Sequence, residues 1–373
     1  MNKTIALFYK KVSSYGGQER FLLKFAQSLK QKGFSPVFFC QKKETDTPFP
    51  VHHLFYIPYP SWLKMLSFAL SSYVITKRLQ SKNIPTIGFG KVFGQNVYRA
   101  GGGIHKKYVK QAVLRWRNRY TRFFYGLKRF FSLYHWFSLL IEHLTFKNKK
   151  TIFIVPSSMV KEDMINYFHV DEKRIRLVYN PVDIESFFPR LKDSHKFTFV
   201  FVSTNHLLKG LDYLIDAFKT ASDRDEGFLK NARLVVAGSG DEDYFLKKIK
   251  KCNLKNIDIL GKRKDIENVY RMGDAFFYPT LYDASGNVIL EAMASSLPCA
   301  VSRFAGYASL IEDAVCGDVI DDPTDVEKMA QLLLHYFYLP QEKLDEMGER
   351  GRELVSLHLS TTFHIEDVLS HIH

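Results

Sequence analysis

A lysine in the second half of the chain stands where a leaving anion could be stabilised. Lys209 follows an apolar run at residues 197–203 and precedes a helical pattern at residues 210–221. A lysine at the end of a strand can neutralise the phosphates of a departing diphosphate. A solvated lysine at a helix start is the alternative interpretation, but there its charge would oppose the helix dipole. The position therefore favours phosphate chemistry.

The segment that runs from Asp283 to Glu291, DASGNVILE, is the most informative of the sequence. Gly286 opens a predicted helix, so the backbone N–H groups of Gly286, Asn287 and Val288 would bind an anion such as a diphosphate. A carboxylate beside a diphosphate is useful only where it binds hydroxyl groups. A sugar nucleotide supplies both, with sugar hydroxyls for Asp283 and ribose hydroxyls for Glu291.

A glycine pair, Gly16 and Gly17, follows the first apolar run and precedes a helical pattern. Glycines let the backbone approach a ligand closely, and a helix start offers N–H groups to an anion. A tight turn without a ligand is the alternative. No third glycine follows at the dinucleotide-binding spacing, so NAD binding is not predicted.

Alternating short apolar runs and amphipathic segments must position these residues. In the first half we expect strands at residues 4–9, 36–40, 84–90, 151–155 and 174–179, a helix at 18–32, and helical structure over much of 106–146. A cleaner strand–helix alternation runs from 197 to 337. This pattern predicts two doubly wound, Rossmann-like α/β domains at residues 1–180 and 181–350, facing a cleft at the carboxyl ends of their strands. Asn180-Pro181 is the candidate hinge, and a helix within 351–373 is expected to pack back on the first domain.

The net charge of +14 is concentrated in one segment. Residues 61–150 contain 18 lysines and arginines and one acid, Glu142, whereas the rest of the chain has a net charge of −3. Between residues 115 and 137 the cations are interleaved with aromatic residues, as in helices at an anionic lipid surface. A nucleic-acid surface and a domain core with solvated cations are the alternatives. The many pure hydrocarbon side chains favour lipid over nucleic acid.

Four cysteines without CxxC spacing suit a reducing compartment and argue against a structural zinc site. No secretory signal and no stretch of about 20 uninterrupted apolar residues is present. We therefore expect a cytoplasmic protein that binds the inner face of the cytoplasmic membrane peripherally.

Taken together, these motifs resemble family four of the retaining GT-B glycosyltransferases. The resemblance rests on Gly16-Gly17, on Lys209-Gly210 and on an acid, Asp283, that seven residues separate from the Glu-Ala-Met-Ala sequence at Glu291. The glycine segment and the stretch from Asn96 to His105 (NVYRAGGGIH) are most similar to the lipopolysaccharide core glucosyltransferases that act on heptose.

The resemblance implies roles for individual residues. Lys209 would hold the donor diphosphate, Glu291 the nucleotide ribose and Asp283 the donor sugar. His105 is similar to a histidine that contacts that sugar. The remaining donor-binding assignments are Gly16, Gly17, Arg174, Asn205, Gly286, Asn287 and Val288.

Three positions depart from the family pattern. One is Gly101-Gly102-Gly103, which stands where the lipopolysaccharide subgroup often has an acid before the histidine. Asp283 replaces the usual glutamate, and Ser203-Thr204-Asn205 stands where an arginine often precedes the lysine. A degenerate, non-catalytic homologue and a GT-B sugar-nucleotide epimerase therefore stay open as alternatives.

The resemblance implies a retaining hexosyltransferase that moves a sugar from a nucleotide donor, expected to be UDP-glucose or another UDP-hexose. The acceptor would be lipid-linked, such as lipopolysaccharide core, at an anionic membrane surface, and no nucleic-acid partner is expected. No cofactor and no metal are expected, because side chains would neutralise the donor diphosphate.

Overall fold

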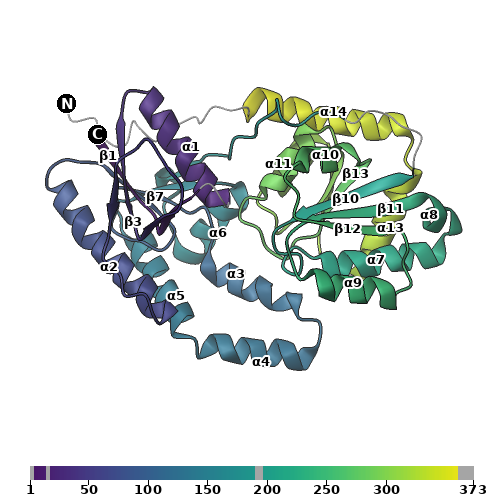
Figure 1. The fold of residues 1–373 in the computed structure, drawn as a ribbon, viewed down its shortest axis with the longest axis horizontal. Helices are drawn as coiled ribbons and strands as arrows, with labels where there is room; N and C mark the ends of the chain where they lie inside the picture. Colours follow the sequence, from purple (N-terminus) through teal and green to yellow (C-terminus); the bar gives the residue numbers. More distant parts are fainter. Residues whose placement is uncertain (1–3, 14–16, 190–195, 360–373) are drawn as a thin grey trace. The chain divides into compact units, whose positions relative to one another are not determined.

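The computed structural model describes residues 4–13, 17–189 and 196–359 and divides the chain into two compact units. The division falls between Asn180 and Pro181. Each unit has its own parallel sheet with helices packed against it, which is the doubly wound architecture that the sequence predicts (Figure 1).

Unit 1 contains a seven-stranded parallel sheet with the order β5-β3-β1-β6-β7-β8-β9. Its strands are β1 (Thr4–Phe8), β3 (Ser35–Cys40), β5 (Val51–His53), β6 (Thr86–Phe89), β7 (Val97–Arg99), β8 (Ile152–Val155) and β9 (Ile175–Leu177). A separate parallel pair joins β2 (Lys11–Val12) and β4 (Lys42–Lys43). Its helices are α1 (Gly17–Gln31), α2 (Ser61–Gln80), α3 (His105–Ala112), α4 (Arg119–Phe130), α5 (Leu133–Lys147) and α6 (Ser158–Phe168), with 3-10 turns at Val113–Arg115 and Glu172–Arg174.

Strand β1 lies at the centre of unit 1 and is buried on both faces. Because successive side chains of a strand point to opposite faces, Ile5 and Leu7 pack with Phe21 and other residues of α1, whereas Phe8 packs with Phe68 of α2. Burial on both faces explains why this strand is a continuous apolar run.

Unit 2 contains a six-stranded parallel sheet with the order β12-β11-β10-β13-β14-β15. Its strands are β10 (Phe197–Ser203), β11 (Ala232–Gly238), β12 (Ile257–Gly261), β13 (Ala275–Tyr278), β14 (Cys299–Ser302) and β15 (Gly317–Ile320). Its helices are α7 (Leu211–Arg224), α8 (Glu226–Asn231), α9 (Glu242–Lys251), α10 (Ile266–Arg271), α11 (Asn287–Ala294), α12 (Ala308–Ala314), α13 (Val326–Tyr338) and α14 (Gln341–His358). In Figure 1, α7, α9 and α13 cover one face of this sheet, and α10, α11 and α14 cover the other.

Helix α14 packs within unit 2, against α11 and α12. Gly348 allows this close approach, because a Cβ there would lie 2.0 Å from the carbonyl oxygen of Ser296. The expected packing of a C-terminal helix on the first domain is not seen for α14, and residues 360–373 lie outside the described part of the chain.

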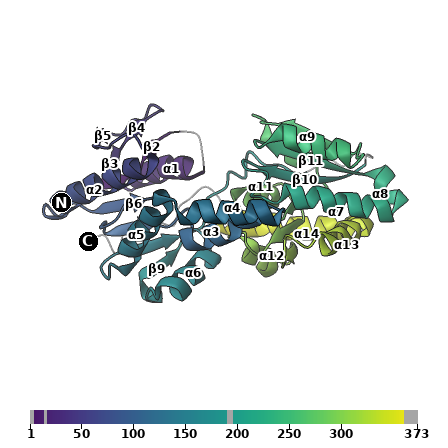
Figure 2. The same cartoon turned by 90° about the horizontal axis from the view of Figure 1, so that it is seen from below.

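The last part of the basic segment, residues 105–147, folds mainly as three consecutive helices, α3, α4 and α5. Figures 1 and 2 show α4 running beside α3, and no residue of α4 is buried. Helix α5 is different, because its residues Ile141 and Phe146 belong to the core. Among the aromatic rings, Phe146 of α5 is therefore a core residue, whereas Tyr134 and Trp136 of α5 are exposed and no ring of α4 is buried.

Candidate functional site

The two charged residues that the sequence predicts for unit 2 lie at one point of the sheet. Lys209 follows β10 and Asp283 follows β13, and these two strands are neighbours. After β10 the chain adds β11 and β12 on one side of that strand, and it then returns to place β13 on the other side. The crevice at the carboxyl ends of such strands is where α/β sheets bind ligands.

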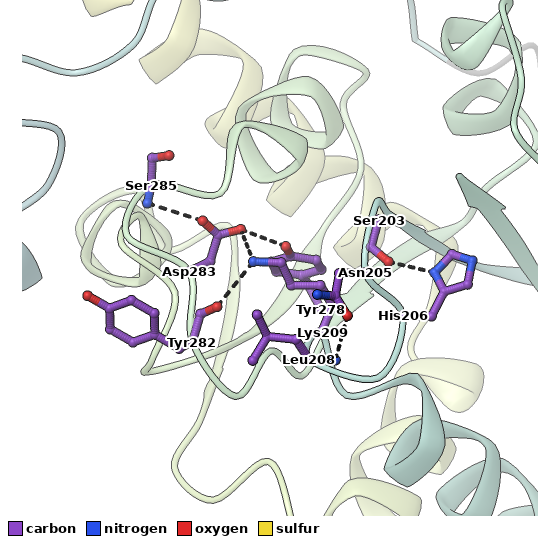
Figure 3. Close-up of polar contacts among 9 residues, drawn as sticks. All are labelled: Ser203, Asn205, His206, Leu208, Lys209, Tyr278, Tyr282, Asp283 and Ser285. Atoms are coloured by element: carbon purple, nitrogen blue, oxygen red, sulfur yellow. Dashed lines mark hydrogen bonds and ion pairs between the residues drawn. The ribbon is translucent and has the colours of Figure 1, made fainter. Parts of the chain in front are cut away.

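Lys209 and Asp283 form an ion pair at this point (Figure 3). Lys209 Nζ donates to Asp283 Oδ2 at 2.6 Å and to the carbonyl oxygen of Tyr282 at 3.1 Å. The same carboxylate accepts from the Tyr278 hydroxyl at 2.8 Å and from the Ser285 N–H at 3.3 Å. Burial favours a higher pKa of Asp283, but Lys209 and these hydrogen bonds outweigh it and hold the pKa below its ordinary value.

A tight turn places Lys209 at the end of β10. The Asn205 side chain accepts from the Leu208 N–H at 3.3 Å, and its carbonyl accepts from the Lys209 N–H at 3.0 Å. Gly210 follows in the left-handed region at φ 82°, and a Cβ there would lie 2.0 Å from the carbonyl oxygen of Pro279. Asn205 thus shapes the turn that carries the lysine, and only glycine fits after it.

Helix α11 begins close to Asp283. Gly286 is its N-cap residue at φ 86°, no side chain caps its first turn, and Asn287 and Val288 begin it. One turn later, Glu291 Oε2 accepts from the Tyr270 hydroxyl at 2.8 Å. The positive end of the helix dipole and the Lys209 ammonium thus both belong to loops at the β10–β13 junction.

His206 lies in the same turn and was not predicted from the sequence. It is 1% exposed, its Nδ1 pairs with the Ser203 hydroxyl at 2.6 Å, and burial lowers its pKa to about 4. Among the described residues its Nε2 has no hydrogen-bond partner. The Ser-x-x-His spacing after a strand was the only available signal.

Unit 1 has a cavity of about 650 Å³ at the corresponding junction of its own sheet. Residues that follow β1 and β6 line it, and the order of that sheet reverses between these two strands. The lining includes four cations, Lys10, Lys64, Lys91 and Arg99, and one acid, Glu142. The cavity thus favours an anionic ligand.

His105 lines this cavity and begins α3. The backbone N–H of His105 donates to Glu142 Oε1 at 2.8 Å. Its ring atom Nε2 lies 2.9 Å from Nδ1 of His135. Burial, together with the charges of Lys91, His135 and Arg129, lowers the pKa of His105 to about 3. The ring is therefore neutral at physiological pH and can exchange only hydrogen bonds with a ligand.

Glu142, like His206, is a residue of these sites for which no role was predicted from the sequence. Burial raises the pKa of this carboxyl, and the Lys91 charge opposes that rise. Its Oε2 is buried and has no hydrogen-bond partner among the described residues. A signal was present in the sequence, since Glu142 is the one acid of a strongly basic segment.

Two predicted residues are not brought to either junction in the described structure, and a third lies outside the described residues. Arg174 donates to the carbonyl oxygens of Asn148 and Thr151, at 2.7 and 3.2 Å. It precedes β9 and so lies at the amino end of the strands, opposite the edge with the cavity, and its donor-binding role stays a prediction. Gly17 is the first residue of α1 and does not line the cavity, although Gln18 does. Gly16 lies outside the described residues.

No group of three or more metal-ligating side chains occurs in the described part of the chain. Over residues 4–13, 17–189 and 196–359, no helix has the length and apolar character needed to cross a bilayer.

Family models match both halves of the chain. Residues 15–186 match the model described as Glycosyltransferase Family 4, and residues 182–354 match the model described as Glycosyl transferases group 1.

Individual relatives match the chain over different lengths. The chain is 23% identical to the lipopolysaccharide glucosyltransferase WaaG of Escherichia coli over 347 residues, which is 88% of each chain. It is 29% identical to the uncharacterized glycosyltransferase MJ1607 of Methanocaldococcus jannaschii over 181 residues. That match covers 44% of this chain and 45% of the relative, so it spans less than half the length of MJ1607.

Solved structures share the fold of the whole chain. A crystal structure of WaaG, a glycosyltransferase involved in lipopolysaccharide biosynthesis, superposes with a TM-score of 0.75 and 20% identity over 94% of this chain and 95% of that one. Anabaena Alr3699/HepE in complex with UDP-glucose superposes with a TM-score of 0.63 and 14% identity, covering 99% and 98% of the two chains.

Proposed function

Because the chain belongs to the glycosyltransferases, with Glycosyltransferase Family 4 in its first half and Glycosyl transferases group 1 in its second, we propose that it transfers a hexose from a UDP-sugar to a lipid-linked glycan. Lipopolysaccharide core is the acceptor class that we favour, and glucose is the favoured sugar. The name of WaaG, a lipopolysaccharide glucosyltransferase, supports this choice, as does the UDP-glucose bound to the structural neighbour Alr3699/HepE.

The observation that carries the proposal is the joint placement of Lys209 and the α11 N-terminus at the β10–β13 junction. When the bond between the sugar C1 and the diphosphate breaks, the electron pair leaves with the diphosphate. The Lys209 ammonium and the N–H groups of Gly286, Asn287 and Val288 would stabilise that charge. Glu291 would accept hydrogen bonds from the ribose hydroxyls.

We assign Asp283 a second task besides contact with the donor sugar. Its Oδ2 already accepts from Lys209 and Tyr278, whereas Oδ1 has a single longer bond of 3.3 Å. Asp283 would therefore aim the lysine through Oδ2 and have Oδ1 available for a sugar hydroxyl. The shorter side chain relative to glutamate is compatible with both roles.

No residue is placed as a covalent nucleophile, so we propose that the acceptor oxygen attacks the sugar on the face that the diphosphate leaves, with retention of configuration. The proton of the acceptor hydroxyl would pass to the departing diphosphate. His105, neutral and partly buried, would only bind and orient.

The acceptor would bind in the cavity of unit 1. Its cations suit the phosphate groups of a phosphorylated sugar, and the buried Oε2 of Glu142 suits a donating sugar hydroxyl. Glu142 is the one acid against four cations in the lining, so a neutral oligosaccharide would leave most of their charge uncompensated. The substrate class is therefore a phosphorylated glycan rather than a neutral one.

A membrane surface would present this acceptor to the enzyme, and α4 is the element that we expect to contact it. Phe123, Phe124, Phe130 and Phe131 are each between 62% and 71% exposed, and α4 carries basic residues among them. Rings at headgroup depth with cations on anionic lipid are the features of an interfacial helix. The protein would then act peripherally at the inner face of the cytoplasmic membrane.

A thermal-shift screen of nucleotide sugars tests the donor assignment. UDP-glucose is expected to raise the melting temperature of the wild type by mass action, and to do so much less for Lys209→Ala and Glu291→Ala. Equal stabilisation of all three proteins would contradict the site. Incubation with UDP-glucose alone identifies an epimerase, because an epimerase would convert it without an acceptor. A non-catalytic homologue would bind UDP-glucose and transfer no sugar even when the acceptor is added.

A further inference from the structure

A second, smaller cavity of unit 1 lies among the helices of the basic segment and is separate from the one assigned to the acceptor. Its volume is about 290 Å³, and it opens between α3, α4 and α5. Most of its walls are hydrocarbon, and two cations and one histidine complete them. The lining residues are Lys106, Val109, Val113, Gly126, Arg129, Phe130, His135, Trp136 and Leu139.

A missing side chain helps to leave this cavity open. Gly126 lies in the interior of α4, where glycine is destabilising relative to alanine. A Cβ on Gly126 would meet no atom within 4 Å, and its backbone is not in the left-handed region. Neither close packing nor backbone geometry therefore requires glycine at this position. The glycine instead removes a side chain that would extend into the cavity.

The charges at the cavity have one sign. Lys106 and Arg129 line it, and the only acid between residues 61 and 150 is Glu142, whose Oε1 accepts the His105 N–H. The guanidinium of Arg129 stacks over the rings of Tyr108 and Tyr125, at 5.3 and 4.6 Å from their centroids. A ligand that combines hydrocarbon with a negative charge would match these walls.

The entrance is continuous with the exposed aromatic surface of the segment. Phe130 and Trp136 line the cavity and are also 62% and 55% exposed, with their ring centroids 6.0 Å apart. An apolar chain could therefore pass from a bilayer to the cavity without crossing a polar surface.

From these observations we infer that the cavity among α3, α4 and α5 binds one acyl chain of an anionic phospholipid, with the lipid phosphate on Lys106 and Arg129. The inference deepens the proposed membrane association, which by itself requires only adsorption of α4 to a charged surface. A lipid seated here would contact His135, whose Nδ1 lies 2.9 Å from Nε2 of His105. The lipid site and the acceptor cavity would thus share one pair of side chains.

Binding of a monomeric lipid separates this site from surface adsorption. Isothermal titration with dioctanoylphosphatidylglycerol, held below its critical micelle concentration, is expected to show one site per chain in the wild type. Gly126→Leu would place a side chain in the cavity and is expected to weaken binding by about tenfold or more. Gly126→Ala is the matched control, because it also strengthens the helix but leaves most of the space open, and it should bind like the wild type.

Two outcomes would overturn the inference. In one, Gly126→Leu binds the monomeric lipid as well as Gly126→Ala does. In the other, the wild type floats with phosphatidylglycerol vesicles but does not bind the monomer, which would show surface adsorption alone. Loss of flotation with retained monomer binding would instead contradict the proposed membrane association and leave the lipid site standing.

A separate experiment tests the assignment of the lipid headgroup. The wild type is expected to prefer dioctanoylphosphatidylglycerol to dioctanoylphosphatidylcholine by about tenfold, and Lys106→Gln/Arg129→Gln should lose that preference but retain the acyl-chain affinity. Equal affinity of the wild type for the two lipids would overturn the assignment of the phosphate to Lys106 and Arg129. Circular dichroism of each variant verifies that the helices are intact.

Discussion

Lys209 Nζ lies 2.6 Å from Asp283 Oδ2, although 74 positions separate the two residues in the sequence. The pair is largely buried, with side chains 13% and 21% exposed, and it joins the loops that follow β10 and β13. An ion pair at this depth holds the lysine in one orientation before any donor binds. Such preorganisation is what allows a charge to stabilise a leaving group without reorganisation during the reaction.

The first prediction concerns this pair. Asp283→Asn removes the carboxylate charge and one acceptor of the Lys209 ammonium, so the lysine is less well oriented. We expect kcat to fall by about 10²–10³, which is the usual cost of losing one preorganised group in such a site. Steady-state kinetics with a UDP-hexose measure it. Asp283→Glu is the matched control, since it restores the charge, and it should retain most of the activity; equal loss in both variants would show that the pair is not the cause.

The turn after β10 gives a prediction for stability. Gly210→Ala would force a Cβ against the Pro279 carbonyl oxygen at a backbone conformation that alanine disfavours. We expect the free energy of unfolding to fall by at least about 1–3 kcal/mol. Urea denaturation measures this change. The same change at Gly126, where a Cβ meets no atom within 4 Å, should be neutral or stabilising. A neutral result at Gly210 would mean that the turn differs from the one described.

The acceptor cavity gives a kinetic prediction. Lys91→Gln removes a cation that lines it, and should raise the KM for a phosphorylated acceptor while changing kcat and the KM for the donor little. A dephosphorylated acceptor serves as the control, because its KM should be the same for the wild type and the variant. An increase in the donor KM alone would place Lys91 outside the acceptor site.

The pH dependence of stability follows from His206. Its pKa is about 4 in the folded chain and about 6.5 in an unfolded one. Between these values the unfolded chain binds more protons, so the unfolding free energy falls as the pH falls through this window. His206 should account for a loss of about 2 kcal/mol between pH 7.5 and pH 5. Denaturation of the wild type and of His206→Gln at both values measures the difference, and equal losses would contradict the buried neutral histidine.

Metal independence is the fifth prediction. Because Lys209 and the start of α11 would neutralise the diphosphate, turnover should survive excess EDTA. A steady-state assay with and without EDTA, followed by added Mg²⁺ or Mn²⁺, tests this. Abolition by EDTA and recovery with either cation would show that a metal supplies part of the charge.

Much of the fold could be predicted because unit 2 alternates short apolar strands with amphipathic helices. Helix α2 (Ser61–Gln80) shows the limit of such patterns. Its buried face contains Ser67, Ser72 and Thr76, whereas Leu70 and Val74 are about half exposed, so its apolar residues do not mark the inward side. The short strand β7 (Val97–Arg99) has too few residues for any periodicity to be visible.

The part of the site that consists of residues directly after strands could be predicted from the sequence. Lys209 and Asp283 follow strands in the sequence, and the parallel sheet brings such loops together. Arg174 opens its expected strand at residues 174–179, so the sequence already places it at the amino end of that strand, and its donor-binding role rests on the resemblance alone. Lys91 and Glu142 were missed because the cavity that contains both is created by the packing of α5 against the sheet loops, over a separation of about fifty residues.

The most direct test of the central claim is transfer of radiolabelled glucose from UDP-glucose to a lipopolysaccharide core acceptor that lacks its outer sugars. The proposal predicts label in the lipid-linked product with the anomeric configuration of the donor, and near-complete loss of that label in Lys209→Ala and Glu291→Ala. Label transferred equally by the wild type and both variants, or a product of inverted configuration, would contradict it.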